Sequence, residues 1–265
     1  MTLSLTARTL LAFVTAGLLL AVYGPIIVTI AGAFLPIKGG MIQSLTPSLD
    51  AFRSLGKDPG LVRSVMLTLV VGAVATMVAV GLSIALALYA VRRGGRHARI
   101  VAFIVFIPFV MPPMVTGLSL LIFFRDLGID RSLVTVTVGH VVLILAVAYR
   151  LVVTRLVDLG PSLIEASLDL GASTWQTFRL VVLPNIAGSL AVAATLCFAL
   201  SFDETLVTLL LTGTDSTFPI KLWGMTRLGI SPAANAILAI LLLVTILLAS
   251  GGLFLARRNS TARAD

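Results

Sequence analysis

The chain has 265 residues, of which 58% are hydrophobic and 11% charged, and its mean hydropathy is +1.11. Soluble domains average about 25% charged residues, so this composition excludes a water-soluble globular protein. The formal net charge of +8 does not indicate a nucleic-acid partner, because no basic run is interleaved with aromatic residues and Lys and Arg collect in the loops of inner-membrane proteins.

Long continuous apolar runs predict membrane-spanning helices. A span needs roughly 20 apolar residues, and backbone groups in hydrocarbon must be paired inside helices or closed barrels. The runs do not alternate as barrel strands would. The first run is longer than the apolar region of a signal peptide, about 7–15 residues, so we expect it to be retained. The six predicted spans cover residues 9–34, 61–91, 100–124, 133–153, 190–211 and 233–256.

Arginine clusters predict the orientation. Residues 92–99 contain four arginines, and the tail after the last predicted span begins with Arg257 and Arg258. With six spans, both clusters lie on the same side, and positive loops face the cytoplasm. We therefore expect both termini to be cytoplasmic, which makes residues 154–189 the longest cytoplasmic segment.

That cytoplasmic segment has the pattern of an amphipathic helix. Pro161 and Ser162 predict its start, Gly171 predicts a bend between two short helices, and Pro184 is expected to end the unit before the next span. Such an element could lie on the membrane surface, dock in a partner or pack on the chain itself. Its apolar residues at helical spacing are Ile164, Leu168, Gly171, Trp175 and Phe178, and its polar ones are Glu165, Asp169, Gln176 and Arg179.

The same segment resembles the EAA loop of permease subunits of binding-protein-dependent ABC importers. Glu165-Ala166-Ser167 is followed by Gly171 and then by Val181-X-Leu183-Pro184, with Ser167 in place of the second Ala and Val181 in place of Ile. In that family the loop forms a coupling helix that seats in a cleft of the cytoplasmic ATPase. The resemblance implies an ATPase-coupling role for Glu165, Ala166, Ser167, Asp169, Gly171, Ala172, Leu183 and Pro184.

Further motifs are similar to the second permease of spermidine/putrescine importers. They are Leu-Gly-Ala-Ser-Thr-Trp (170–175), Ser-Phe-Asp-Glu (201–204) and Thr-Phe-Pro-Ile-Lys-Leu-Trp (217–223). The resemblance implies an all-α membrane protein with one permease domain over 1–265, a core over 61–255 and a coupling loop over 154–189. It also implies a bacterial inner-membrane location.

The resemblance implies several partners. These are two cytoplasmic ATPases, a second and homologous permease that completes the substrate pathway, a periplasmic or extracellular binding protein, and membrane lipid. The chain has no Gly-X4-Gly-Lys-Ser/Thr loop, so we expect the partners to bind ATP. The chain itself is expected to be no enzyme and to hold neither cofactor nor metal.

A few residues in and beside the predicted spans are candidates for the substrate pathway. Asp203 and Glu204 lie in the fifth predicted span, where a carboxylate either lines a pathway or forms a buried pair. Pro112, beside Pro108 and Pro113 in the third span, marks a hinge or a static kink. Trp223 is either an interfacial anchor or a contact at the outer gate. His140 is expected to bond between helices rather than to relay protons.

Three functions fit this pattern to different extents. An ABC importer permease for a polyamine explains both the coupling loop and the two carboxylates. Opines, other amino-acid derivatives, aminoethylphosphonate and ferric iron remain alternative cargoes. A secondary transporter would need coupling-ion sites and usually internal repeats, which the sequence does not display, and a membrane scaffold would leave the amphipathic segment without a transport role.

Overall fold

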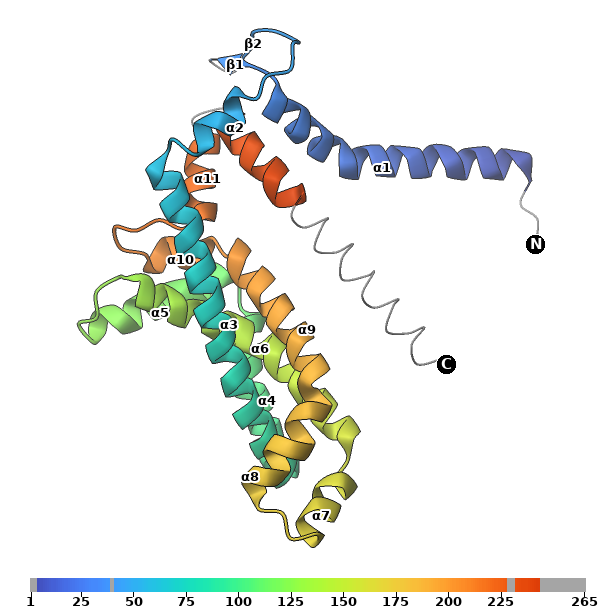
Figure 1. Cartoon of the computed structure of the whole chain (residues 1–265), viewed down its shortest axis with the longest axis vertical. Coiled ribbons are helices and arrows are strands. Elements are labelled where there is room, and N and C mark those ends of the chain that lie inside the picture. Colours follow the sequence, from blue (N-terminus) through green and yellow to red (C-terminus); the bar gives the residue numbers. More distant parts are fainter. Residues whose placement is uncertain (1–3, 39–40, 228–231, 244–265) are drawn as a thin grey trace. The chain divides into compact units, whose positions relative to one another are not determined.

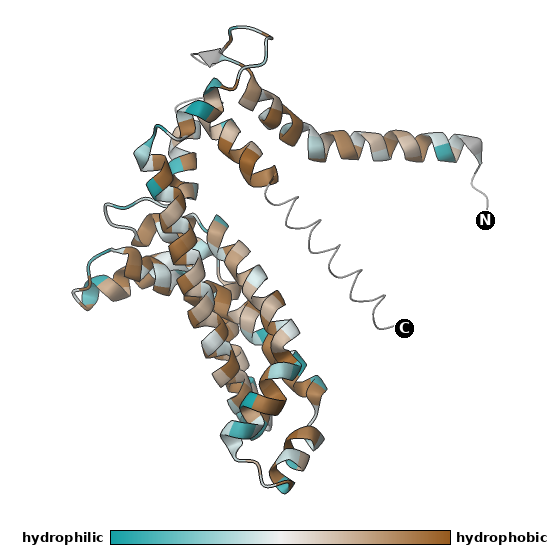
Figure 2. Cartoon of the chain, in the orientation of Figure 1, coloured by the Kyte–Doolittle hydropathy of each residue, from teal (hydrophilic) through white to brown (hydrophobic). Residues whose placement is uncertain are grey.

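The computed structural model describes residues 4–38, 41–227 and 232–243, and the chain divides into two compact units (Figure 1). One unit is residues 63–221, and the other combines 1–62 with 222–265. In the described residues of both units the helices are dominated by hydrophobic residues, and hydrophilic residues gather at helix ends and loops (Figure 2). This is the distribution expected of helices that meet lipid along their sides.

The unit formed by the two ends of the chain begins with the long apolar helix α1 (Leu5–Phe34). A short antiparallel pair, β1 (Ile37–Lys38) and β2 (Met41–Ile42), and the short helix α2 (Asp50–Leu55) follow. The ring of Phe34 packs on that of Phe52 with centroids 5.0 Å apart, which joins the end of α1 to α2. The unit also contains the apolar helix Pro232–Leu243.

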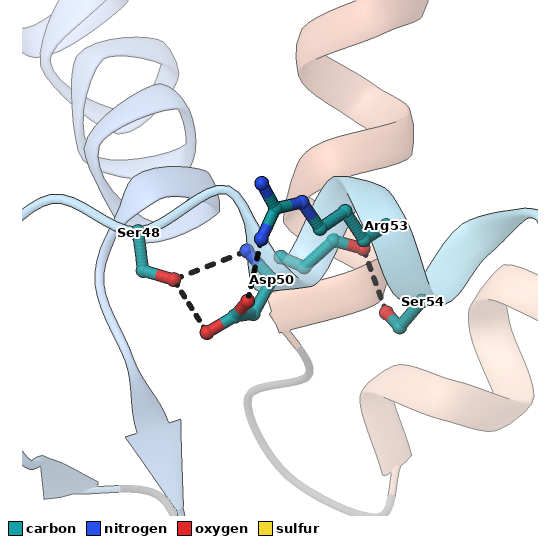
Figure 3. A network of polar contacts seen from close by, with 5 residues as sticks. Ser48, Asp50, Arg53 and Ser54 are labelled. Atoms are coloured by element: carbon teal, nitrogen blue, oxygen red, sulfur yellow. Dashed lines mark hydrogen bonds and ion pairs between the residues drawn. The ribbon is translucent and has the colours of Figure 1, made fainter.

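Hydrogen bonds at its N-terminus hold α2 in place (Figure 3). The Ser48 hydroxyl donates to the Asp50 carboxylate at 2.7 Å and accepts from the Asp50 N–H at 3.1 Å. Asp50 also pairs with Arg53 at 3.7 Å, and Ser54 donates to the Ala51 carbonyl at 2.7 Å. An acidic residue in the first turn and a basic one in the last also suit the helix dipole.

The second unit contains most of the remaining helices. It holds α3 (Pro59–Arg93) from residue 63 onward, α4 (Gly95–Val110), α5 (Pro113–Asp126), α6 (Leu133–Leu159), α7 (Ser162–Asp169) and α8 (Thr174–Thr177). The π-helical turn η1 (Phe178–Val182), α9 (Leu183–Asp203), α10 (Leu206–Leu211) and the start of α11 (Phe218–Arg227) complete it.

Helix α6 is the centre of this unit and packs against α9, α4 and α10 (Figure 1). Small residues fill many of its contacts. One buried cluster joins Ala75 and Ala79 of α3 to Ala148 of α6 and Cys197 of α9. Without a strong hydrophobic drive between helices in lipid, small side chains allow the close approach on which packing depends.

The helices support most of the predicted spans. Among the described residues, four helices are long and apolar enough to cross a membrane, and a fifth span results if α4 and α5 count as one. The predicted sixth span, 233–256, is described only as far as Leu243, and its remainder lies outside the described residues. The count of six, like the cytoplasmic position of both termini, stays a prediction.

Two details of the predicted spans are wrong. The fifth was expected to be one helix over 190–211, but α9 ends at Asp203 and α10 starts at Leu206. Pro184 was expected to end the amphipathic unit, but it lies at the start of α9, which continues from α8 through η1 as one apolar stretch from Thr174 to Asp203. Proline removes an N–H from the regular ladder inside a helix, and here the stretch passes through the π-helical turn η1 directly before Pro184 and does not end.

Candidate coupling segment and intramembrane site

The amphipathic segment is two helical pieces joined by a tight bend, as predicted. Helix α7 ends in a Schellman-type cap: the Gly171 N–H donates to the Leu168 carbonyl at 2.9 Å, and the Ala172 N–H donates to the Ser167 carbonyl at 3.1 Å. Gly171 has φ of +83°, and a Cβ there would meet no atom within 4 Å. Glycine is therefore required at this bend by its backbone conformation and not by lack of space.

The second piece starts with its own cap and is tied back to the first. Ser173 caps α8 by accepting from the Gln176 N–H, and the Gln176 side chain accepts from the Ser173 N–H. This reciprocal capping box satisfies two donors at the helix start. Ser167 Oγ of α7 lies 3.0 Å from Thr177 Oγ1 of α8. The helix start predicted at Ser162 is confirmed, although its side chain makes no cap hydrogen bond and Pro161 is the cap residue.

The predicted coupling residues differ in exposure. Glu165, Ala166, Asp169 and Gly171 are exposed, whereas Ser167, Ala172 and Leu183 are half-buried and Pro184 is exposed on α9. An exposed face bearing two carboxylates is available to a partner. Beside it lies a cavity of about 950 Å³, lined mainly by apolar side chains of α3, α6 and the segment, with Arg92 and Glu165 among its walls.

A buried polar cluster lies in the membrane-spanning part of the same unit. His140 of α6 is 2% exposed. Its Nδ1 lies 2.7 Å from Ser201 Oγ at the end of α9, and its Nε2 lies 2.7 Å from Thr208 Oγ1 in α10. The prediction that His140 bonds between helices is confirmed. Ser201 and Thr208 were not predicted, although they are seven residues apart and therefore share one face of a helix.

Glu204 stands at the interruption between α9 and α10. Its Oε1 accepts a hydrogen bond from the Val207 N–H at 2.9 Å, and its carbonyl accepts one from Thr208 Oγ1 at 2.9 Å. The side chain therefore supplies a partner to a backbone donor that the helix break leaves free. Asp203 is exposed and Glu204 is half-buried, and neither forms an ion pair within the described part of the chain.

A second interruption lies between α4 and α5, which meet at an angle of 105°. Pro112 has no N–H to donate to the Pro108 carbonyl, and the hydroxyl of Thr116 donates to that carbonyl instead, at 3.3 Å. Pro113 then begins α5. The kink predicted from the prolines is present, and a threonine restores the lost backbone hydrogen bond.

Both interruptions contribute to the walls of one small cavity of about 160 Å³. Its polar walls are His140, Ser201 and Glu204, and its apolar walls are Phe109, Pro113, Leu143, Ile144 and Leu200. Of the predicted pathway residues, Glu204 lines this cavity, whereas Asp203 and Pro112 lie next to lining residues in the chain. Trp223 belongs to the other unit, where the guanidinium of Arg227 lies 3.8 Å from its ring centroid.

The fold and this site together indicate the class of protein. Several apolar helices, two interruptions and a cavity with polar residues in its walls are typical of a multi-pass membrane transport protein. Residues 77–260 match the family described as the binding-protein-dependent transport system inner membrane component. The chain belongs to this family. It is a permease subunit of an ABC importer in the bacterial inner membrane, and therefore a transport subunit rather than an enzyme.

Two characterised permeases are similar to this chain in sequence. The putrescine transport system permease protein PotI of Escherichia coli (strain K12) is 31% identical over 199 residues, which cover 72% of this chain and 71% of PotI. The spermidine/putrescine transport system permease protein PotC of the same strain is 31% identical over 179 residues, 67% of each chain.

Solved structures agree on the fold. A bacterial ABC transporter involved in the import of the acidic polysaccharide alginate has a TM-score of 0.71 at 17% identity, covering 96% of this chain and 95% of that one. The MetNI methionine ABC transporter has a TM-score of 0.58 at 22% identity, covering 77% of this chain and 95% of the other.

Proposed function

We propose that this permease passes a polyamine, putrescine or spermidine, or a similar small organic cation, across the membrane. One observation carries the proposal: Glu204 lines a cavity inside the membrane-spanning unit and has no cationic partner among the described residues. An unpaired carboxylate in a membrane is costly and marks a pathway by default. The names of PotI and PotC support the same class of cargo.

The proposed pathway is shared between two permeases. Glu204 and its neighbour Asp203 attract the cation, and the interruption at Pro112 shapes the cavity wall. Trp223 is proposed to contact the cargo at the outer gate. A second, homologous permease supplies the other half of the pathway, and a periplasmic or extracellular binding protein delivers the substrate. The whole chain is one permease domain whose core covers residues 61–255. It has six spans and both termini in the cytoplasm, so α7 lies on the cytoplasmic side, where the ATPases bind.

The proposed energy input enters through the coupling segment. Helix α7 seats in a cleft of an ATPase with Glu165, Ala166 and Asp169 at the contact, and Gly171 sets the angle to the second piece. Two cytoplasmic ATPases bind and hydrolyse ATP, so this chain needs no cofactor or metal of its own. Closing of the ATPases moves the two coupling segments and switches access to the pathway from one side to the other.

Transport by the reconstituted importer tests the cargo. The permease, its partner permease, the ATPases and the binding protein would be placed in proteoliposomes with radiolabelled putrescine. We expect uptake that requires both ATP and the binding protein. A binding protein with no affinity for polyamines would refute the proposed cargo, and uptake driven by an ion gradient without ATPase would point to secondary transport.

The charge at residue 204 can be tested separately. Glu204→Gln keeps the volume of the side chain and removes its charge, and hydrogen bonds to charged groups contribute about 1.5–3 kcal/mol. We therefore expect putrescine transported per ATP hydrolysed to fall at least roughly tenfold. Asp126→Asn, in an exposed ion pair with Arg125, is the matched control and should leave the ratio unchanged. Equal ratios for the two variants would contradict the role of Glu204.

A further inference from the structure

His140 connects the two helical segments on either side of Glu204. It belongs to α6, yet its two ring nitrogens contact Ser201 in the last turn of α9 and Thr208 in α10, each at 2.7 Å. The ring is 2% exposed, so water does not compete for these bonds. A single side chain on a neighbouring helix therefore spans the interruption, and Glu204 lies between its two contact points.

Counting protons gives the direction of each bond. The Thr208 hydroxyl has one proton, and it donates that proton to the Glu204 carbonyl at 2.9 Å. Thr208 Oγ1 must then accept from His140, so Nε2 carries a hydrogen. In the neutral ring Nδ1 is an acceptor and receives the Ser201 hydroxyl proton. The chain of donors runs from Ser201 to His140, from His140 to Thr208, and from Thr208 to the backbone of Glu204.

We propose that His140 is a positioning residue, which fixes the backbone of Glu204 and so directs its carboxylate into the 160 Å³ cavity. The inference rests on the proposed function, because it concerns how Glu204 is presented to a cation. Three hydrogen bonds hold Glu204 in place: Thr208 donates to its carbonyl, the Val207 N–H donates to its Oε1, and its own N–H donates to the Ser201 carbonyl at 3.4 Å. His140 acts on the first by holding the hydroxyl of Thr208 in its donating orientation.

Two amide substitutions separate the two contacts of the ring. The amide nitrogen of Gln reaches about the position of Nε2, so His140→Gln retains the donor to Thr208. The amide oxygen of the shorter Asn takes about the position of Nδ1, so His140→Asn retains the acceptor for Ser201 and loses Thr208. Only the Thr208 hydroxyl bonds both the ring and Glu204, because Ser201 contacts Glu204 through its backbone carbonyl, which accepts the Glu204 N–H at 3.4 Å, and not through the hydroxyl that meets the ring. A positioning role therefore predicts that His140→Gln preserves transport and His140→Asn does not.

A threonine pair provides the matched control. Thr208→Val removes the hydroxyl that links His140 to Glu204 and keeps the shape of the side chain. Thr137→Val makes the same chemical change on α6, where the hydroxyl only donates to the Leu133 carbonyl one turn earlier at 2.7 Å. Both variants lose one hydroxyl in a membrane helix, and only the first affects the interruption.

The measurement is putrescine transported per ATP hydrolysed by the complete importer in proteoliposomes, at saturating putrescine-loaded binding protein. Loss of folded complex lowers both quantities together and leaves their ratio unchanged. We expect the ratio to fall roughly five- to tenfold for His140→Asn and Thr208→Val, as for a buried polar partner left unsatisfied. It should stay within about twofold for His140→Gln and Thr137→Val.

The outcomes distinguish this inference from the proposed function. Equal ratios for Thr208→Val and Thr137→Val would overturn the positioning role, even if the His140 variants fail to assemble. Equal losses for the Asn and Gln variants of His140 would do the same. If Glu204→Gln lowers the ratio and Thr208→Val does not, only the positioning role fails. If Glu204→Gln leaves the ratio unchanged, the role proposed for Glu204 fails as well.

Discussion

Gly171→Ala should damage coupling between ATP hydrolysis and transport without destabilising the membrane helices. Gly171 has φ of +83°, and a Cβ there would meet no atom within 4 Å. The cost of the substitution is therefore confined to the backbone conformation. An L-residue with a Cβ costs about 1–2 kcal/mol in the left-handed region, which alters the ratio of correct to incorrect bend conformations by roughly 5- to 30-fold.

Gly128 provides a matched control directly after α5 in the same unit. It has φ of +70°, and a Cβ there also meets nothing within 4 Å. Its hydrogen bonds follow the same pattern as those at Gly171: the Gly128 N–H donates to the Arg125 carbonyl at 2.9 Å, and the Ile129 N–H donates to the Phe124 carbonyl at 2.8 Å. Gly128→Ala thus carries the same local cost at a bend outside the proposed coupling segment.

The assay compares these variants in the reconstituted importer by ATPase stimulation on addition of loaded binding protein and by putrescine transported per ATP. We expect Gly171→Ala to reduce both by roughly fivefold or more, with Gly128→Ala close to wild type. Gly171→Asn should recover part of the loss, because Asn tolerates the left-handed region better than Ala. Equal effects at the two glycines would refute the assignment of this bend to coupling.

Three further experiments test the packing. Gly139→Ala would place a Cβ 2.6 Å from side-chain carbons of α10, so we expect a loss of about 1–3 kcal/mol, seen as a lower melting temperature in detergent than for the unobstructed Gly188→Ala. The Arg63–Asp215 ion pair is partly exposed, and a double-mutant cycle should give a coupling energy below about 1 kcal/mol. Cys197 is fully buried, so a maleimide should label it only after denaturation; rapid labelling of the folded protein would contradict this packing.

The spans and the bend were predictable because each depends on local sequence. A run of apolar residues long enough to cross a bilayer predicts a helix whatever surrounds it. Gly171 between two amphipathic pieces predicts a bend because glycine alone adopts the left-handed conformation without cost. The prolines at 112 and 113 predicted a kink for the same local reason.

The interruption after Asp203 was not predictable in the same way. The apolar run of α9 resumes at Leu206–Leu211 after only a short polar interval that contains Asp203 and Glu204, so hydropathy averaged over a span predicts one helix and not a break. The contacts that bridge the break join segments far apart in the sequence, above all His140 with Ser201 and Thr208, and sequence patterns do not show such contacts. Pro184 misled the prediction in the opposite sense. A proline usually interrupts a helix, but here the helical stretch continues through Pro184 after the π-helical turn η1.

The two helix interruptions satisfy their free backbone groups in the same way, and both lie beside the same cavity. A broken helix in a membrane leaves backbone groups without partners, and these are tolerated only where protein or a cavity supplies them. The Thr116 hydroxyl donates a hydrogen bond to the Pro108 carbonyl, and the Thr208 hydroxyl donates one to the Glu204 carbonyl. Each repair uses a threonine hydroxyl from the following helix, so one backbone carbonyl at each interruption is hydrogen-bonded.

This repair also gives Glu204 two roles at once. Its carboxylate caps the Val207 N–H and lines the cavity, so removing its charge weakens the start of α10 as well as the attraction for a cation. Asp203 has no such backbone contact among the described residues and is exposed. Asp203→Asn should therefore change transport per ATP by less than Glu204→Gln and leave the melting temperature of the solubilised permease unchanged, whereas Glu204→Gln should lower it. If Asp203→Asn has the larger effect on transport, the exposed carboxylate and not the capped one attracts the cation.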